Sequence, residues 1–220
     1  MQAVPANRRH IGAKARRITA NVKDSSLIGE RRDQIVNAAI AVFLDRGFAA
    51  ATMRDVGLRA GLSQGTLYNY VRTKEDTLYL VCDRAVTHYT EQIARAIDGA
   101  TDPRERLTRA VRAVVRAQFD HRHNILIVLR EAHLLDARSR EAVRRRVDVF
   151  LDEIVAIVSA GLADAPRRRA SARLLAEAVT YLPTLFAMRP WRLKDEGGSE
   201  KVIDGLVDIL LAALRIEQPA

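Results

Sequence analysis

The chain of 220 residues is poor in cysteine, aromatic residues, proline and glycine. Its single cysteine, Cys82, excludes an intrachain disulfide framework and a four-cysteine zinc site, and we expect it to be a small buried apolar side chain. No apolar run approaches the roughly 18 residues that a membrane-spanning helix needs. The basic N-terminus also lacks the apolar stretch of a secretory signal. We therefore expect no membrane partner and a cytoplasmic location.

Apolar residues are abundant, at 48% of the chain, which is enough for a substantial core. Only 6 prolines and 11 glycines punctuate the sequence, and no long alternation of apolar and polar residues predicts strands. We therefore predict an all-α fold. It would divide into a basic arm (residues 1–29), a helix-turn-helix unit (residues 30–80) and a C-terminal helical unit (residues 81–220).

Positive charge is concentrated at the N-terminal end. Residues 1–80 hold 13 Lys and Arg against 7 Asp and Glu, so they carry +6 of the formal net charge of +9. Such an excess is typical of a surface that meets nucleic-acid phosphates. Residues 7–23 are basic and show no helical period, and we expect them to be disordered alone. This arm could lie along phosphates or in a minor groove, or it could be a solvated tail.

Residues 52–74 predict two short helices joined by a tight turn. Thr52 begins a Thr-x-x-Asp pattern that can cap a helix, and Gly61 supplies the flexible backbone of a turn. Ser63 can cap a second helix over residues 63–70, and Thr73 a third. Upstream, residues 31–46 have apolar side chains at a 3.6-residue period, and Gly47 follows as a C-terminal cap. Three helices within about 40 residues fit a helix-turn-helix unit.

Residues 31–80 resemble the DNA-binding domain of the TetR family of transcriptional regulators. The matching residues are Arg46, Gly47, Phe48, Thr52, Arg59, Ala60, Gly61, Ser63, Gly65, Leu67, Tyr68, Tyr70 and Lys74. Two residues depart from the family pattern. Gly57 replaces the usual Ala inside the second helix, at a cost of roughly 1 kcal/mol in helix propensity. Val71 replaces a frequent Phe.

The resemblance implies a set of DNA contacts. They are Thr52, Arg54, Ser63, Gln64, Gly65, Thr66, Tyr68, Asn69, Tyr70 and Lys74. Hydroxyl and cationic groups in this set would meet phosphates, with Tyr70 partly packed and Gly65 allowing close approach of the helix. Gln64, Thr66 and Asn69 are suited to base edges in the major groove. Val56 and Leu67 should point into the core.

The C-terminal unit divides into helices at its Pro and Gly residues. The predicted ranges are 78–97, 103–120 with Thr101 as a cap, 124–135, 140–160, 167–188 and 200–216. Pro183 should kink the fifth of these helices, and Gly197-Gly198 should form a flexible loop. In the TetR family the last two helices pair with those of a second subunit, so the resemblance implies a homodimer on a palindromic operator. Gly205 would allow close helix approach there. The alternative is that both helices complete a monomeric core.

The resemblance also implies a small-molecule effector bound among the middle helices. Residues 121–165 and 188–193 are similar to members that sense acyl-CoA thioesters. The acyl chain would lie among apolar residues, and Arg side chains would hold the phosphates. The alternatives are an ordinary ion pair for Arg130 with Glu131, and an interface or core anchor for Trp191. The candidates are Phe119, Leu126, Leu129, Arg130, Tyr181, Leu185, Phe186, Arg189, Trp191 and Arg192. A hydrophobic drug or a free fatty acid is the alternative, and repression is favoured because most members repress.

Motifs of other functional classes are absent from the sequence. It has no nucleophile elbow, zinc-protease motif, phosphate-binding glycine loop or di-iron motif, so we expect neither an enzyme nor a cofactor. His121 and His123 do not share a helical face, so we expect no metal site at them. A helical enzyme and a helical adaptor remain distant alternatives.

Overall fold

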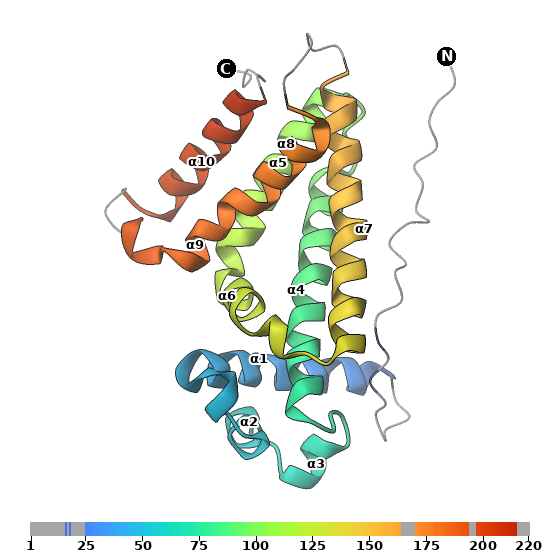
Figure 1. Cartoon of the computed structure of the whole chain (residues 1–220), viewed down its shortest axis with the longest axis vertical. Helices are drawn as coiled ribbons and strands as arrows, with labels where there is room; N and C mark the ends of the chain where they lie inside the picture. The colour runs from blue at the N-terminus through green and yellow to red at the C-terminus, as the bar shows by residue number, and fades with distance from the viewer. Residues whose placement is uncertain (1–15, 17, 19–24, 164–169, 194–196, 215–220) are drawn as a thin grey trace.

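The computed structural model describes residue 16, residue 18 and residues 25–163, 170–193 and 197–214. These residues form helices and contain no strand, which confirms the predicted all-α fold (Figure 1). The α-helices are α1 Ser25–Ala50, α2 Met53–Ala60, α3 Gln64–Tyr68, α4 Lys74–Ala96, α5 Pro103–Asp120, α6 Arg122–Glu131, α7 Ala137–Gly161, α8 Ala172–Tyr181, α9 Leu185–Met188 and α10 Ser199–Ala213. Short 3₁₀ turns occupy Ala132–Leu134, Leu182–Thr184 and Pro190–Arg192. None of the described helices combines the length and apolarity of a membrane span.

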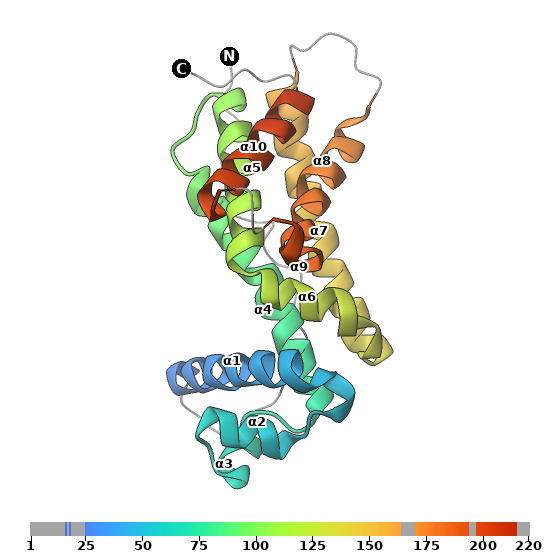
Figure 2. The same ribbon diagram turned by 90° about the vertical axis from the view of Figure 1, so that its left-hand side faces the viewer.

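The helix-turn-helix lies at one end of the long axis, and α3 is its outermost element (Figures 1 and 2). Helix α4 leaves this end and runs into the bundle of α5, α7 and α8 (Figure 1). Its first half, including Leu78 and Val81, belongs to the core under α1–α3, and Ile93 belongs to the core of the bundle. The predicted division at residue 80 therefore falls inside one continuous helix, which links the two units mechanically.

Local capping chemistry determines where the first helices begin and end. The Thr52 hydroxyl oxygen accepts the Asp55 N–H at 3.2 Å, and the Asp55 carboxylate accepts the Thr52 N–H at 3.0 Å. The Ser63 and Thr73 side chains accept the N–H groups of Thr66 and Asp76 and so cap α3 and α4, and Gly61 ends α2 with a left-handed φ of 65°. Gly47 interrupts α1 with a φ of 73°, as expected for a helix end, although α1 begins earlier than predicted.

Two predictions for the C-terminal unit are wrong in detail. Asp102, not Thr101, caps α5, because its carboxylate accepts the Glu105 N–H at 2.7 Å and Pro103 then occupies the first helical position. Pro183 does not merely kink a long helix. It lies in a 3₁₀ turn that separates α8 from α9, since it lacks the N–H that an α-helix needs. Residues 167–169 and 215–216 of the predicted helices lie outside the described residues.

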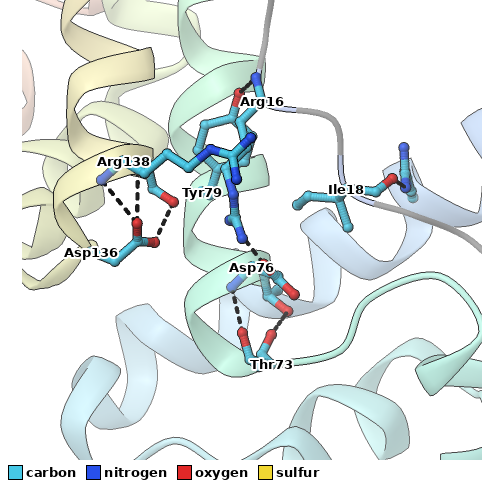
Figure 3. Close-up of polar contacts among 10 residues, drawn as sticks. Arg16, Ile18, Thr73, Asp76, Tyr79, Asp136 and Arg138 are labelled. Carbon is cyan, nitrogen blue, oxygen red and sulfur yellow. Dashed lines mark hydrogen bonds and ion pairs between the residues drawn. The ribbon is translucent and has the colours of Figure 1, made fainter.

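Arg16 and Ile18 are not solvated, contrary to the expectation for a disordered arm. The Arg16 guanidinium lies 2.9 Å from the Asp76 carboxylate and 5.6 Å from the centre of the Tyr79 ring (Figure 3). Ile18 is buried in the first core, and its carbonyl accepts a hydrogen bond from Arg32. Arg16 also contributes to holding the pKa of Asp136 below its usual range, after the larger effect of the Ser139 hydrogen bonds. Arg16 is therefore anchored where α4 meets the start of α7, and Ile18 in the first core; the other basic residues of the predicted arm lie outside the described residues.

Candidate nucleic-acid interface and inner cavity

Helix α3 is held to the rest of the protein along one side only. Leu67 is fully buried, and so are Val56 on α2 and Val71 just after α3, as expected for core residues. Tyr70 is only 4% exposed, and its ring belongs to the same core. The resemblance implies a DNA contact for Tyr70 with its ring partly packed; burial this complete gives Tyr70 a packing role that supports α3.

The opposite side of α3 faces solvent. Ser63, Gln64, Gly65 and Asn69 are exposed, Thr66 is half-buried, and Tyr68 is 46% exposed. A Cβ atom built at Gly65 would meet nothing within 4 Å, so no contact inside the chain requires glycine there. The Ser63 and Thr66 hydroxyls lie 2.9 Å apart and are hydrogen-bonded to each other. The predicted recognition residues therefore share one open face at the end of the molecule.

Gly57 allows α2 and α3 to cross closely. A Cβ atom at this position would lie 2.6 Å from Nε2 of Gln64 and 3.3 Å from the carbonyl oxygen of Leu62. Nε2 of Gln64 also lies 3.5 Å from the carbonyl oxygen of Met53. Gly57, which departs from the family pattern, thus leaves space for the Gln64 side chain.

Thr52 and Arg54 lie at the exposed start of α2. The Thr52 hydroxyl donates to the Asp55 carboxylate at 2.6 Å, and this hydrogen bond is the main reason that the pKa of Asp55 falls below its usual value. Arg46 adds an ion pair to the same carboxylate at 3.2 Å. Thr52 is therefore occupied as a helix cap, while the Arg54 side chain remains exposed.

Lys74 does not reach outward as predicted. Its Nζ donates to the carbonyl oxygens of Phe48, Ala49 and Ala51 at 2.8, 3.1 and 2.9 Å, and it lies 4.5 Å from the centre of the Phe48 ring. An ammonium group has three N–H donors, and these three carbonyls use all of them. In this arrangement Lys74 therefore has no N–H left for the predicted hydrogen bond to a phosphate. Lys74 instead ties the end of α1 to the start of α4.

An inner cavity of about 240 Å³ lies among α4, α5, α6, α7 and α8. Its lining is Cys82, Ala85, Val86, Tyr89, Gln118, Ile125, Val128, Leu129, Val143, Val147, Phe150, Leu151, Glu177, Thr180, Tyr181 and Thr184. Cys82 is buried as predicted, and burial raises the pKa of its thiol to about 12. Among the described residues, no Lys or Arg side chain lines this cavity.

Few of the predicted effector residues meet at this cavity. Leu129 and Tyr181 line it, whereas Phe119 and Phe186 line a second cavity of about 250 Å³ beside α9 and α10. Leu126 and Leu185 line neither cavity. Arg130, Arg189 and Trp191 also line neither, and all three are exposed; the side chain of Arg192 lies outside the described residues. Tyr89 and Gln118 could not be identified from the sequence. Each lies on a helix with many polar residues, and no motif distinguishes either from the others.

His88 on α4 and His121 after α5 are in contact, with ring centroids 4.9 Å apart and ring planes tilted by 47°. Nε2 of His121 lies 2.9 Å from Nε2 of Gln92. Desolvation is the main cause that lowers the pKa of both imidazoles, and His88 and Arg84 lower that of His121 further. Both rings are therefore neutral in the folded protein at neutral pH.

Acidification should destabilise the protein through this histidine pair. Both pKa values are lowered on folding, so the unfolded chain takes up protons first as the pH falls below about 6.5. The histidine pair therefore costs no stability above this pH and lowers the free energy of unfolding progressively below it. The Tm should fall between neutral pH and a pH of about 5. His88→Gln should flatten that dependence, whereas His133→Gln, which removes an exposed imidazole, should not. Equal pH profiles for the wild type and His88→Gln would contradict the assignment.

The two structural units match two protein families. Residues 35–78 match the family described as bacterial regulatory proteins, tetR family, and residues 100–191 match the tetracyclin repressor-like C-terminal domain. The first range contains α2, α3 and most of α1, and the second contains α5, α6, α7 and α8, which surround the inner cavity together with α4. The sequence resemblance at residues 31–80 is thus confirmed and extends into the C-terminal unit.

Individual relatives agree with these matches. The transcriptional regulator HbdR of Aromatoleum sp. strain CIB is 27% identical over 199 residues, which cover 89% of this chain and 86% of HbdR. A tetR-family regulator from Rhodococcus RHA1 shares the fold with a TM-score of 0.75 at 20% identity, covering 86% of this chain and 99% of that one. AibR, solved with isovaleryl coenzyme A and operator DNA, has a TM-score of 0.67 at 18% identity, covering 81% and 97%. With both units matched and the helix-turn-helix geometry preserved, this chain is a member of the TetR family of ligand-responsive, DNA-binding transcriptional regulators.

Proposed function

We propose that α3 enters the major groove of a palindromic operator and reads base edges with Gln64, Thr66 and Asn69. Support comes from one observation above all: α3 is pinned on one side by Leu67, and its opposite polar side is open. Amide side chains at Gln64 and Asn69 can pair with adenine, and the Thr66 methyl can meet thymine. Arg54, Ser63 and Tyr68 would contact phosphates, and the bare backbone at Gly65 would permit close approach. Thr52, whose hydroxyl and N–H both donate to Asp55, would contribute as the cap that positions the start of α2.

Loss of the Gln64 amide should relax sequence preference more than it weakens general DNA binding. Gln64→Ala is expected to lower operator affinity by about 10- to 100-fold, since a good base contact provides about 1–3 kcal/mol of discrimination. Binding to unrelated DNA and the slope of affinity against salt should stay unchanged, because no phosphate contact is lost. Asn37→Ala, which removes an exposed amide from α1, is the matched control. A uniform loss on all sequences in a fluorescence anisotropy titration would contradict base reading by Gln64.

The protein would act as a homodimer joined through α8 and α10. These helices lie on the same side of the molecule (Figure 2). Leu174 on α8 is 60% exposed and Ile209 on α10 is 61% exposed, and the backbone at Gly205 is open to close approach. Covering such residues against a second copy removes apolar surface from water. A twofold dimer would also place two recognition helices on two half-sites, which one five-residue helix needs for specificity.

The effector would be a small hydrophobic molecule held in the inner cavity, and its binding would release the operator. An acyl-CoA thioester is supported by the sequence resemblance and by the fold shared with AibR. Its acyl chain would enter the cavity while the charged coenzyme stayed outside, since no cation lines the interior. A hydrophobic drug or free fatty acid is the second candidate class. We further propose a repressor acting in the cytoplasm, not a helical enzyme or adaptor, because the matched relatives are transcriptional regulators.

A further inference from the structure

Two polar residues of the inner cavity each hold a buried oxygen without a hydrogen-bond partner. They are Oε1 of Gln118 on α5 and the hydroxyl of Tyr89 on α4. Gln118 as a whole is only 8% exposed. A buried oxygen that lacks a partner costs free energy, so a native protein rarely keeps one without a use for it. Both residues line the same apolar cavity, so a ligand bound there is the group placed to satisfy both oxygens.

The orientation of the Gln118 amide is fixed by its neighbour on α8. Nε2 of Gln118 donates to the carbonyl oxygen of Thr180 at 2.7 Å. That carbonyl can only accept, so the amide cannot be turned over without placing two acceptors face to face. The Thr180 hydroxyl donates instead to the carbonyl of Ala176, at 2.9 Å, and offers Gln118 nothing. Oε1 of Gln118 therefore remains an acceptor that only an O–H or N–H group can satisfy.

Tyr89 supplies the complementary group. Its ring lies 6.4 Å from the Phe150 ring and 6.4 Å from the His121 ring, measured between centroids. Burial raises the pKa of its hydroxyl, so the hydroxyl keeps its proton at neutral pH and can donate it. The cavity thus presents one fixed acceptor and one hydroxyl that can donate or accept.

The rest of the lining opposes a charged ligand. Its side chains are mainly aliphatic and aromatic, and Glu177, the one carboxylate among the described lining residues, would repel an anion. An anionic head group held inside would lose its hydration without gaining a cationic partner. The interior therefore favours an uncharged group.

From this geometry we infer that the part of the effector held in the inner cavity is uncharged and mainly hydrocarbon, and that it carries one O–H or N–H donor for Gln118. An oxygen on the same group, as in an alcohol or a primary amide, accepts from Tyr89. A carboxylate or a thioester has no proton to give to Gln118, so neither class satisfies the pair. The inference rests on the proposed function, because it assumes that this cavity is the effector site. It also narrows the proposed ligands, since an acyl-CoA fits only if its acyl chain itself carries a hydroxyl or amide group inside the cavity, and a free fatty acid does not fit.

Ligand binding in the cavity would affect the DNA-binding end of the protein through two helices, α4 and α6. Tyr89 lies on α4, whose first residue, Lys74, holds three carbonyls at the end of α1. Val128 and Leu129 line the cavity from α6, and Ile127 of the same helix lies in the core beneath α1. A ligand that binds one arrangement of α4 and α6 better than another must shift the affinity for DNA by that difference.

Isothermal titration of the full-length protein, without DNA, tests the ligand chemistry directly. The probes are 1-decanol, decyl methyl ether and decanoate, which share an apolar chain and differ in the head group. The ether accepts but cannot donate, and decanoate is ionised at neutral pH. We expect 1-decanol to bind at least about tenfold more tightly than either, because the other two leave Gln118 unpaired. Equal affinities, or tighter binding of decanoate, would overturn the inference, and so would the absence of binding by all three probes.

Tyr89→Phe separates this inference from a purely structural role of the residue. The variant should bind 1-decanol about fivefold more weakly, as expected for one lost hydrogen bond. Its Tm without ligand should be equal to or above that of the wild type, because an unsatisfied hydroxyl has left the interior. Tyr68→Phe, which removes an exposed hydroxyl, should change neither quantity. A lower Tm with unchanged affinity would mean that the protein itself or bound water satisfies Tyr89, and it would overturn the inference. If 1-decanol binds as expected but leaves the operator bound, the proposed coupling fails while the ligand chemistry stands.

Discussion

Lys74→Ala is expected to lower the free energy of unfolding by about 3 kcal/mol, since hydrogen bonds to a charged group contribute about 1.5–3 kcal/mol each and are not additive. The substitution leaves the carbonyls of Phe48, Ala49 and Ala51 without their shared donor. It also removes the cation above the Phe48 ring. For a chain of this length the Tm should fall by roughly 6–12 °C. Operator affinity should fall with it, because the end of α1 supports the helix-turn-helix.

The comparison with Tyr68→Ala shows whether Lys74 supports DNA binding through the fold or through a direct contact. Tyr68 is largely exposed on α3, so removing its ring should weaken operator binding while leaving the Tm unchanged. Lys74→Ala should lower both, and cooling should restore part of the operator affinity of the Lys74 variant but none of that of the Tyr68 variant. Calorimetry and anisotropy on the same samples measure both quantities. If Lys74→Ala weakens DNA binding at an unchanged Tm, the lysine acts as a phosphate contact after all.

Leu174→Asp combined with Ile209→Asp is expected to convert a dimer into monomers and to weaken operator binding at least about 100-fold. Two half-sites joined in one dimer bind with an avidity that exceeds a single site by about 10²–10⁴-fold. Both residues are exposed in the single chain, so the charges should not disturb its core. The slope of operator affinity against salt should fall to about half, because each monomer meets half of the phosphates.

Leu134→Asp provides the control for this double variant. It places the same charge on an exposed leucine of the Ala132–Leu134 turn, away from α8 and α10. Light scattering coupled to gel filtration should report a dimer for the wild type and for Leu134→Asp, and a monomer for the double variant. A dimer that survives both charged substitutions would place the subunit interface elsewhere.

The helix-turn-helix could be predicted from the sequence because its chemistry is local. Thr52, Ser63 and Thr73 each accept an N–H from a residue three positions later, and Gly61 takes the backbone angle that favours glycine. Such interactions depend only on neighbours in the chain. Leu67 and Val56 were placed in the core by the same short-range periodicity.

The remaining features depend on contacts between distant segments. Lys74 meets carbonyls 23 to 26 residues earlier, so its inward role could not be seen in the motif that it shares with the family. Side chains from five α-helices and the Leu182–Thr184 turn line the inner cavity, and their spacing shows no pattern in the sequence. For that reason only Leu129 and Tyr181 were anticipated, while Phe119 and Phe186 line a second cavity. From the sequence, Gly57 is expected only to lower the helix propensity of α2. The close crossing of α2 and α3 explains why a glycine is present there.

Selection of sheared genomic DNA on the full-length protein, followed by footprinting of the tightest fragment, tests the central claim most directly. The selection should be carried out at about 0.15 M salt, where interactions between charges more than about 8 Å apart are screened and non-specific DNA binding is weak. Two half-sites one helical turn apart, or a multiple of it, should be protected, and Gln64→Ala should lose that protection. Retention of fragments without a shared sequence, unchanged in Gln64→Ala, would contradict sequence-specific reading by α3.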